Sequence, residues 1–235
     1  MPTTRTHRAA KAVTLAPAAR LACLLCLAAS AALLAGCNII GPIAVLASGP
    51  PKTQAQYTLD PTKVTVIVID DRASRTPQRS LRDIVGRSAE EELLRRKLVN
   101  DMVKSNLALG VMARERFGSP LTIAELGQAL KAETVIYATV DEFALSPDGQ
   151  TYSPFTRLRV RVVDATTGNR LFPPPGTTDW AKLDVDIPAQ ATEKPGGGEQ
   201  NAALQDLARV TGLALAQMFY THENREAPKR LRERQ

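Results

Sequence analysis

The chain has 235 residues and a formal net charge of +6, but its first 36 residues hold four of the 30 basic residues and none of the 24 acidic ones. The remaining residues carry 26 basic and 24 acidic side chains, a net charge of only +2 that does not indicate a nucleic-acid-binding protein. Aromatic residues make up 4% of the chain, so there is little surface on which bases or sugar rings would stack.

Residues 1–36 have the pattern of a secretory signal peptide. Basic residues come first, and an uncharged, Leu/Ala-rich run follows from Leu21 to Gly36. This run of about 16 residues is shorter than the roughly 20 that span a bilayer. It ends in Leu34-Ala35-Gly36-Cys37, which resembles the lipoprotein box of bacterial lipoproteins at all four positions.

The resemblance to the lipoprotein box implies a covalent anchor. Cys37 would receive a diacylglyceryl group on its thiol, cleavage would fall between Gly36 and Cys37, and the new amine would be acylated by a fatty acid such as palmitate. Three acyl chains hold a protein on a membrane essentially permanently, whereas one gives marginal binding. In such lipoproteins Asp after the cysteine favours the inner membrane, so Asn38 implies the outer membrane, on its periplasmic face.

The rest of the chain divides into three parts. Residues 37–61 are expected to be the lipidated N-terminus and a tether punctuated by Gly-Pro pairs. Residues 62–221 hold the periodic apolar segments of one periplasmic domain, and residues 222–235 are expected to be a charged, disordered tail. The other two cysteines, Cys23 and Cys26, lie in the leader, so we expect no disulfide and no cofactor beyond the lipid on Cys37.

The first half of the domain starts with a strand and a long helix. Residues 63–69 are dense in β-branched residues, which predicts a strand buried on both faces. Residues 80 to about 105 have helical periodicity, with Leu94, Leu98 and Met102 four residues apart on the expected inner face. Ser80 and Asp83 resemble a capping box at the start of this helix.

The middle of the domain has the clearest local signals. Thr122 and Glu125 form a capping box that opens a short helix, and residues 134–140 make a second apolar strand that ends at Asp141-Glu142. Residues 157–163 alternate basic and apolar side chains, which predicts a half-exposed antiparallel strand. Gly168 ends the following loop and supplies the positive φ that a short hairpin needs.

The last elements complete the predicted fold. Residues 179–187 alternate again, and residues 199–221 form an amphipathic helix. The order of elements predicts an α/β domain, an α+β sandwich in which a mixed β-sheet of about four to five strands has helices packed mainly on one face.

Three segments together resemble a known family. They are residues 64–71, residues 125–140 with their Leu-Gly to Val-Ile passage, and residues 161–168 with Val-Asp followed by Thr-Gly. The combination is similar to the periplasmic lipoprotein domains related to the TolB amino-terminal domain and the curli-secretion lipoprotein CsgG. The chain departs from CsgG because its alternating strands are short and broken by Pro173–Gly176, so the resemblance does not extend to membrane-spanning hairpins.

Two groups of side chains are candidates for a functional site. If the strands that end at Asp70-Asp71 and at Asp141-Glu142 are parallel neighbours, four carboxylates meet at one sheet edge, where Mg²⁺ or Ca²⁺ would find oxygen ligands. The alternative is that these carboxylates solvate strand ends or cap the next segments. Arg157, Arg159 and Arg161 form a basic stripe for a partner, with a solvated face as the alternative.

The residues favour a protein that works through its surface. His222 is the one histidine after the leader, and the sequence holds neither a nucleophile elbow nor a phosphate loop, so we expect no enzyme. The leading hypothesis is a membrane-anchored, non-catalytic assembly or docking module of the cell envelope, with an envelope protein or a second copy as partner. A subunit of an export or transport complex is a special case of this hypothesis. A spacer that binds peptidoglycan and an enzyme with a divalent-metal carboxylate site stay open as alternatives.

Overall fold

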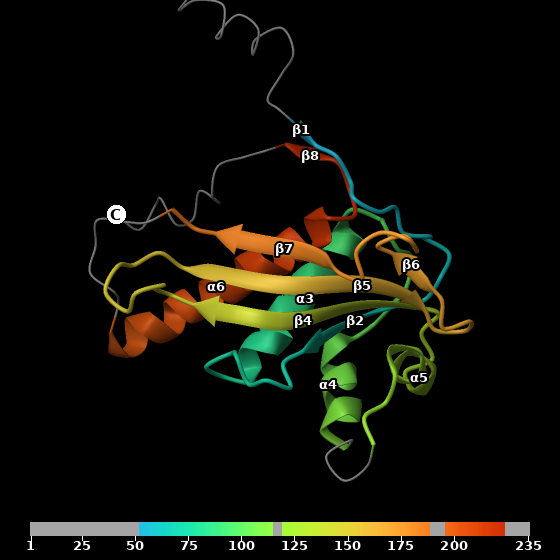
Figure 1. Cartoon of the computed structure of the whole chain (residues 1–235), viewed down its shortest axis with the longest axis horizontal. Helices are drawn as coiled ribbons and strands as arrows, with labels where there is room; N and C mark the ends of the chain where they lie inside the picture. Colours follow the sequence, from blue (N-terminus) through green and yellow to red (C-terminus); the bar gives the residue numbers. More distant parts are fainter. Residues whose placement is uncertain (1–51, 115–118, 189–195, 224–235) are drawn as a thin grey trace, which may run out of the picture. The chain divides into compact units, whose positions relative to one another are not determined.

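The computed structural model describes residues 52–114, 119–188 and 196–223. A mixed six-stranded sheet has the order β3-β2-β4-β5-β6, with β7 also paired to β5 (Figure 1). Its strands are β2 (Thr65–Asp70), β3 (Met102–Val103), β4 (Thr134–Ala144), β5 (Phe155–Asp164), β6 (Arg170–Phe172) and β7 (Ala181–Asp186). The helices of this part are α3 (Ser80–Arg95), α4 (Ser105–Arg114), α5 (Ile123–Ala129) and α6 (Gly197–Gln217). The predicted α+β class is confirmed, with more strands than expected.

The strands β2 and β4 form the parallel centre of the sheet. Every residue of β2 is buried, and its register with β4 runs from Thr65 opposite Thr134 to Asp70 opposite Thr139. β-Branched side chains pack well on both faces of a covered sheet, which is why this run becomes a central strand. The buried strand is therefore as predicted, and the structure meets the condition, left open by the sequence, that β2 and β4 are parallel neighbours.

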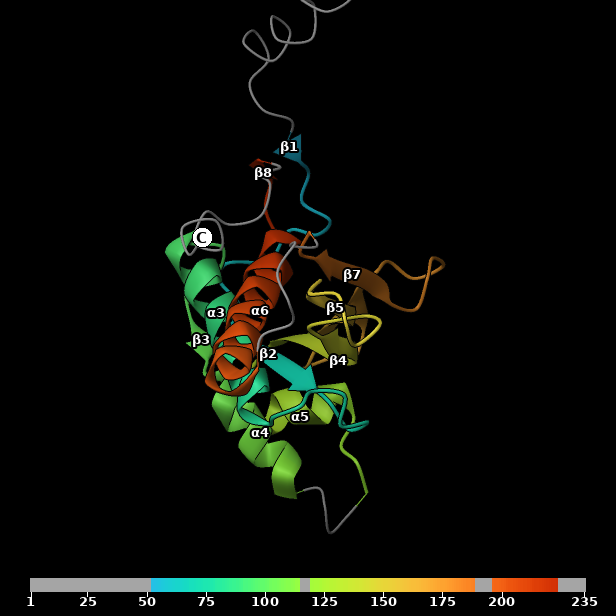
Figure 2. The same cartoon turned by 90° about the vertical axis from the view of Figure 1, so that its left-hand side faces the viewer.

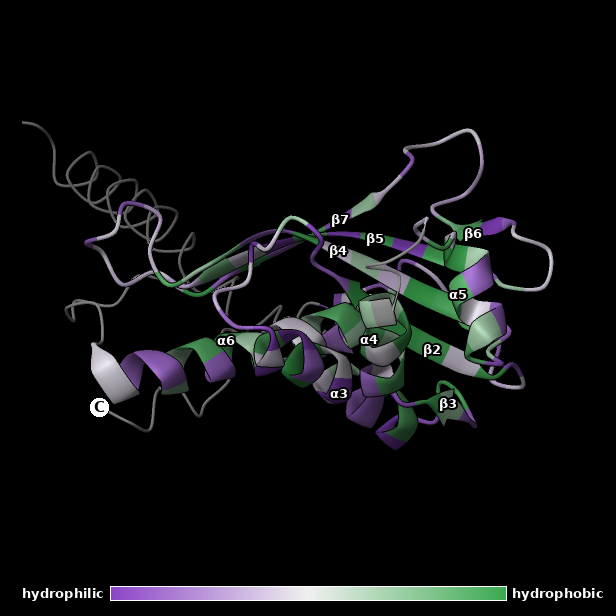
Figure 3. Cartoon of the chain, turned by 90° about the horizontal axis from the view of Figure 1, so that it is seen from below, coloured by the Kyte–Doolittle hydropathy of each residue, from purple (hydrophilic) through white to green (hydrophobic). Residues whose placement is uncertain are grey.

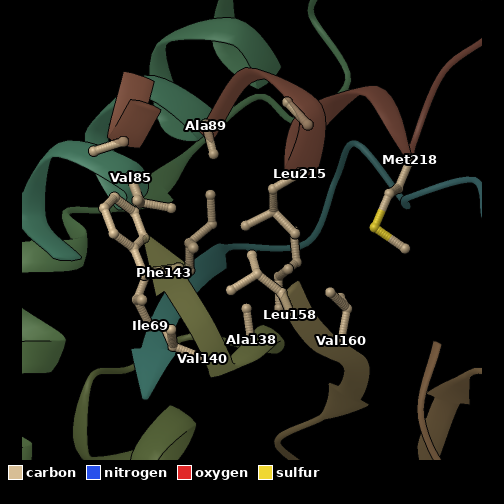
Figure 4. Close-up of a cluster of buried hydrophobic side chains, with 14 of the residues drawn as sticks. Ile69, Val85, Ala89, Ala138, Val140, Phe143, Leu158, Val160, Leu215 and Met218 are labelled. Carbon is tan, nitrogen blue, oxygen red and sulfur yellow. The ribbon is translucent and has the colours of Figure 1, made fainter. Parts of the chain in front are cut away.

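The sheet carries helices on both faces, whereas the sequence predicted helices mainly on one face. Ile67 and Ile69 pack with α3 and α6, whereas Val66 and Val68 pack with Ala108 of α4 and with α5. Figure 2 shows α3 and α6 packed side by side, and Figure 4 shows side chains of the sheet pointing toward them. The second layer follows from β2, because a strand that is apolar on both sides needs a cover on each.

The helix predicted over residues 80 to about 105 is shorter in the structure, where the strand β3 follows it before α4. α3 ends at Arg95, Lys97 adopts a left-handed backbone with φ +56°, and the Leu98 N–H bonds back to the Leu93 carbonyl. This is a Schellman-type ending, here without glycine, and it redirects the chain into β3 and then α4. The inner face differs too: Leu93 is buried and Leu94 is 44% exposed. The Ser80–Asp83 capping box is wrong, since α3 begins after Arg79 without a side-chain cap.

The second capping box is confirmed. The Thr122 hydroxyl accepts from the Glu125 N–H, and the Glu125 carboxylate accepts from the Thr122 N–H, at the start of α5. Position 127 of α5 requires glycine, because a Cβ there would clash with Val135 on β4 and with Ala165. The Leu-Gly to Val-Ile passage is thus a close contact between a helix and the strand after it.

The hairpin after β5 also forms as predicted. Gly168 has φ +74° and lets the chain turn into β6. The Asp164 carboxylate accepts from the N–H groups of Thr166 and Thr167 and from the Lys63 ammonium at 2.8 Å. The bond from Lys63 and that from Thr167 lower the pKa of Asp164 to about 2. The Val-Asp to Thr-Gly motif therefore has a structural role, which is to hold the turn and tie it to the start of β2.

The folded unit starts earlier than residue 62. It runs from Lys52 onward, and β1 (Lys52–Thr53) pairs antiparallel with β8 (His222–Glu223). Leu59 is buried in the core beside α3 and α6, with Tyr57 packed against it. The end of the predicted tether and the start of the predicted tail thus belong to the folded unit, and residues 224–235 lie outside the described part.

Candidate functional site: an arginine ladder on the open side of β5

The outward face of β5 carries three arginines at alternate positions. We call Arg157, Arg159 and Arg161 the arginine ladder; their side chains are 25–41% exposed. The residues between them, Leu158, Val160 and Val162, are buried against α3 and α6. Figure 3 shows hydrophilic and hydrophobic bands alternating along β5, as the sequence predicts.

Each arginine of the ladder has an acidic partner on a neighbouring segment. Arg159 makes a two-pronged contact with the Asp141 carboxylate, with Nε and Nη2 at 2.8–3.0 Å from its oxygens. The Arg157 Nη2 donates to Asp186 at 2.6 Å, and its Nε lies 3.6 Å from Asp184. The register of β5 with β7 places Asp184 opposite Arg157. The predicted basic stripe is therefore a network of both charge signs.

The Trp180 ring packs against two arginines of the ladder, Arg159 and Arg161. The guanidinium of Arg161 lies 3.9 Å from the Trp180 ring centroid and that of Arg159 lies 5.3 Å from it. Such cation–π contacts hold the guanidinium planes against the ring. The Arg161 Nε also donates to the Asp179 carbonyl at 2.6 Å. Sequence reasoning left Trp180 out of the site, although it has the same strand parity as Lys182 and Asp184.

The surroundings of the three ladder arginines shift their pKa values in different directions. Hydrogen bonding to Asp186 raises the pKa of Arg157, and hydrogen bonding to Asp141 raises the pKa of Arg159. The pKa of Arg161 is lowered because burial outweighs the attraction of Asp179. The ladder can therefore present fixed, charged donors to an incoming group, with two guanidiniums already oriented by a carboxylate.

The four carboxylates proposed for a metal do not come together at strand ends. β4 continues to Ala144, so Asp141 lies inside a strand, at the irregularity between Val140 and Glu142. Asp141 binds Arg159 as described, and Glu142 lies opposite Arg157 in the register of β4 with β5. Antiparallel pairing with β5 extends β4 beyond the acidic residues, which the sequence of β4 alone did not indicate.

Asp70 and Asp71 have structural partners of their own. The Asp70 carboxylate accepts from the Tyr137 hydroxyl at 2.6 Å and from the Arg72 N–H at 3.1 Å. Asp71 accepts from the N–H groups of Arg75 and Thr76 and so closes the loop after β2. Among residues 52–114, 119–188 and 196–223, no three His, Cys, Asp or Glu side chains are grouped to hold a metal ion. The carboxylates of Asp70 and Asp71 therefore hold local structure, as the alternative interpretation of the sequence has it.

A second polar cluster lies where α3 meets the end of α6. The buried Glu92 carboxylate accepts from the Tyr220 hydroxyl at 2.6 Å, from Arg95 Nε at 2.9 Å and from Arg96 Nε at 3.0 Å. Burial alone would raise the pKa of Glu92, but these hydrogen bonds outweigh it and the pKa is lowered. Burial and the bond to Glu92 raise the pKa of Tyr220 to about 12. The cluster joins two helices and leaves no free carboxylate.

The lipidation residues cannot be located in this fold. Gly36, Cys37 and Asn38 lie outside the described residues, so lipidation and cleavage stay predictions. No helix of the described part is long and apolar enough to cross a membrane. His222 is in β8, where its Nδ1 lies 3.2 Å from the Tyr220 carbonyl oxygen.

The chain matches no family model and no curated protein, whereas solved structures resemble it distantly. A PelC dodecamer from Paraburkholderia phytofirmans is 14% identical, with a TM-score of 0.36 over 71% of this chain and 95% of that one. Lipoprotein GNA1162 from Neisseria meningitidis is 11% identical, with a TM-score of 0.39 over 63% and 96%. The LpoB C-terminal domain from Salmonella enterica is 15% identical, with a TM-score of 0.32 over 53% and 84%.

Likenesses this distant carry no argument about what the chain does. The resemblance to the TolB amino-terminal and CsgG-like domains stays a prediction from sequence.

Proposed function

We propose that this chain is a lipid-anchored, non-catalytic docking module of the bacterial cell envelope, which binds a protein partner through the arginine ladder. The observation that carries the docking role is the fixed geometry of the ladder. Arg159 and Arg161 are oriented by Asp141 and Trp180 while their side chains are still partly exposed. Arginine and tryptophan are enriched at interface hot spots, and less entropy is lost when a side chain is already ordered.

The ladder suits a partner surface that carries positive and negative side chains together with planar groups. A partner carboxylate that displaces Asp141 or Asp186 would gain two-pronged hydrogen bonds to a guanidinium. Because the ladder already has acidic neighbours, a purely acidic partner would also meet repulsion from Asp184 and Asp186, which are exposed. We therefore favour a protein surface with mixed charges over an anionic polymer.

The docking role is tested by in-cell cross-linking of the variant in which Arg157, Arg159 and Arg161 are changed to Ser. The cross-linked product of the wild type should be lost, because the donors are gone while the buried residues of β5 are untouched. A matched control changes three other exposed arginines to Ser. They are Arg79, just before α3, Arg87 on α3 and Arg209 on α6. Equal products from the ladder variant and the control would contradict the proposal.

The anchor rests on Leu34-Ala35-Gly36-Cys37 and is tested separately. Metabolic labelling with a fatty acid should mark the wild type, and Cys37→Ala should abolish the label. The outer membrane is our proposed location because Asn38 follows the cysteine. Density fractionation should place the protein with outer-membrane markers, and co-migration with inner-membrane markers would refute that location.

A further inference from the structure

The strand β7 has one hydrogen-bonding edge without a neighbouring strand. In the part of the chain that the structure describes, β7 pairs with β5 alone, on the side of β5 away from β4 (Figure 1). The Ile187 N–H, just after β7, donates to the Pro154 carbonyl at 2.9 Å on the β5 side. Because successive residues of a strand direct their backbone groups to opposite edges, those of Lys182, Asp184 and Asp186 point away from β5. An edge of this kind can accept a further strand.

Most of the devices that block edge-to-edge pairing are missing from β7. The strand contains no proline, and its register with β5 runs from Ala181 to Asp186 without a bulge. On the core face, Ala181 and Val185 are buried and Leu183 is half-buried, so the inward side chains of β7 carry no charge. Prolines, bulges and inward-pointing charges are common means of protecting an edge. The core face of β7 therefore does not oppose pairing.

The outer face of β7 is complementary to itself. Its side chains are Lys182, Asp184 and Asp186, and all three are exposed. When two β7 strands pair antiparallel with Leu183 at the centre, each Lys182 lies opposite the Asp184 of the second copy. Lys182 has no ion pair with a described residue, and the Arg157 Nε lies 3.6 Å from the Asp184 carboxylate. Both side chains can therefore take an additional partner.

The core face fits the same register. Leu183 meets the Leu183 of the second copy, and Ala181 meets Val185, so the inward pairs are all apolar. A shift by two residues would set Lys182 opposite Lys182 or Asp184 opposite Asp184, where like charges repel. A shift by one residue would set backbone groups that point toward β5 against groups that point away from it. One register thus satisfies hydrogen bonding, charge and apolar contact together.

We infer that two copies of this chain pair antiparallel through the free edge of β7, with Leu183 on the twofold axis. The contact is isologous, because both copies use the same surface. The two sheets then form one continuous sheet, and the two arginine ladders lie on the same face of it. Three strand spacings put about 14 Å between the two β5 strands. For the proposed docking function, on which this consequence alone rests, the pair would present two ladders to one partner.

The test is a disulfide trap with the full chain in intact cells. Residues that face each other in a non-hydrogen-bonded antiparallel pair have Cα atoms about 4.5 Å apart, which a disulfide can bridge. Leu183→Cys should therefore give a linked dimer after mild oxidation, seen on a non-reducing gel. The parent chain, which has Cys23, Cys26 and Cys37, measures any dimer that forms through the native thiols.

Two other single cysteines separate this register from unspecific contact. In the proposed pair, position 186 faces position 180, so the two copies of Asp186→Cys are about 20 Å apart along the strands and should give no dimer above that of the parent. Leu107→Cys on α4, where the side chain is 55% exposed, measures random collision. A dimer as strong with Asp186→Cys as with Leu183→Cys would refute the register.

Charge reversal tests the complementarity. Lys182→Glu or Asp184→Lys, each added to Leu183→Cys, makes two attractive cross-strand pairs repulsive and should lower the yield of dimer about tenfold. Two differently tagged chains, one with each reversal, should link to each other, because their cross-strand pairs are attractive again. The mixed dimer also controls for folding, since both variants must be folded to form it.

Three outcomes would refute the pairing. With Leu183→Cys, a dimer yield no higher than that of the parent would exclude the β7 contact and leave the docking function untouched, because the trap involves neither the ladder nor its partner. A dimer that neither reversal weakens would show that Lys182 and Asp184 do not face each other. A dimer that is lost in both reversals and does not return in the mixture would also contradict the complementary register.

Discussion

The two sides of β5 have opposite surroundings although they belong to one strand. On one side Leu158, Val160 and Val162 are sealed under α3 and α6. On the other side the arginine ladder is partly exposed, with Arg159 bound to the Asp141 carboxylate and Arg161 packed on the Trp180 ring. One strand thus supplies both core stability and an exposed polar surface, because successive side chains point to opposite faces.

The two faces of β5 should contribute differently to the free energy of unfolding. Burial of apolar side chains contributes about 25 cal/mol per Å² removed from water, whereas exposed ion pairs contribute about 0–1 kcal/mol each. We therefore expect the sealed side to determine stability and the open side to determine recognition.

The largest effect is expected on the sealed side. Leu158→Ala should lower the free energy of unfolding by about 2–5 kcal/mol, since it leaves a cavity where the side chain is 2% exposed. Urea denaturation would measure the loss. The control is Leu107→Ala on α4, a side chain that is 55% exposed, which should change stability by less than about 0.5 kcal/mol. Equal losses of stability at both positions would contradict the idea that the buried side of β5 determines stability.

The cover of the sealed side depends on close helix packing. A Cβ at Gly212 of α6 would overlap the Val85 carbonyl oxygen and lie 2.7 Å from the Ser88 Cβ, both on α3. Gly212→Ala should therefore push the helices apart and cost roughly 1–3 kcal/mol by thermal or chemical unfolding. Gly110→Ala on α4, where no atom lies within 4 Å, should instead stabilise by about 0.5–1 kcal/mol. The same sign at both sites would contradict this packing.

Glu92 on α3 is a buried charge, so it should contribute more to stability than the exposed ion pairs of the open side. Glu92→Gln should cost about 1–3 kcal/mol at neutral pH, because charge-assisted hydrogen bonds from Arg95, Arg96 and Tyr220 are weakened. The pKa of Glu92 is lowered in the folded state, so its contribution is complete above the unfolded-state value of about 4.3 and is lost as the pH falls through the lower folded value.

The stability difference between wild type and Glu92→Gln should therefore shrink in acid. Unfolding curves at neutral pH and at several acidic pH values would show it. The neighbouring Glu91 is exposed, so Glu91→Gln is the control and should give a small difference at every pH. A Glu92→Gln deficit that grows on acidification would mean that the sign assigned to this pKa is wrong.

The smallest effect is expected on the open side. A double-mutant cycle with Arg159→Ala and Asp141→Ala should give a coupling energy of about 0.2–1 kcal/mol, and less at high salt, because both side chains are more than a third exposed. A coupling well above this range would show that the ladder contributes to stability and would blur the difference between the two sides.

Local sequence signals were enough for several elements of the fold. The β-branched run of β2, the Thr122–Glu125 capping box and the positive φ at Gly168 each depend on neighbours within a few residues. The alternation of β5 likewise assigns the arginine ladder to one face, because strand side chains repeat with period two. Such features involve short-range sterics and hydrogen bonds, which a short stretch of sequence contains in full.

Tertiary pairing decided the rest. β4 continues past Asp141 because β5 lies beside it, and the carboxylate of Asp141, which the sequence offered as a candidate metal ligand, binds Arg159. Part of the positive charge of the ladder is balanced by Asp184, because the register of β5 with β7 places this carboxylate opposite Arg157. Lys52 meets Glu223 only because the folded core brings the two ends together. These contacts join residues far apart in the chain, and their geometry follows from strand register and helix packing, which no local pattern specifies.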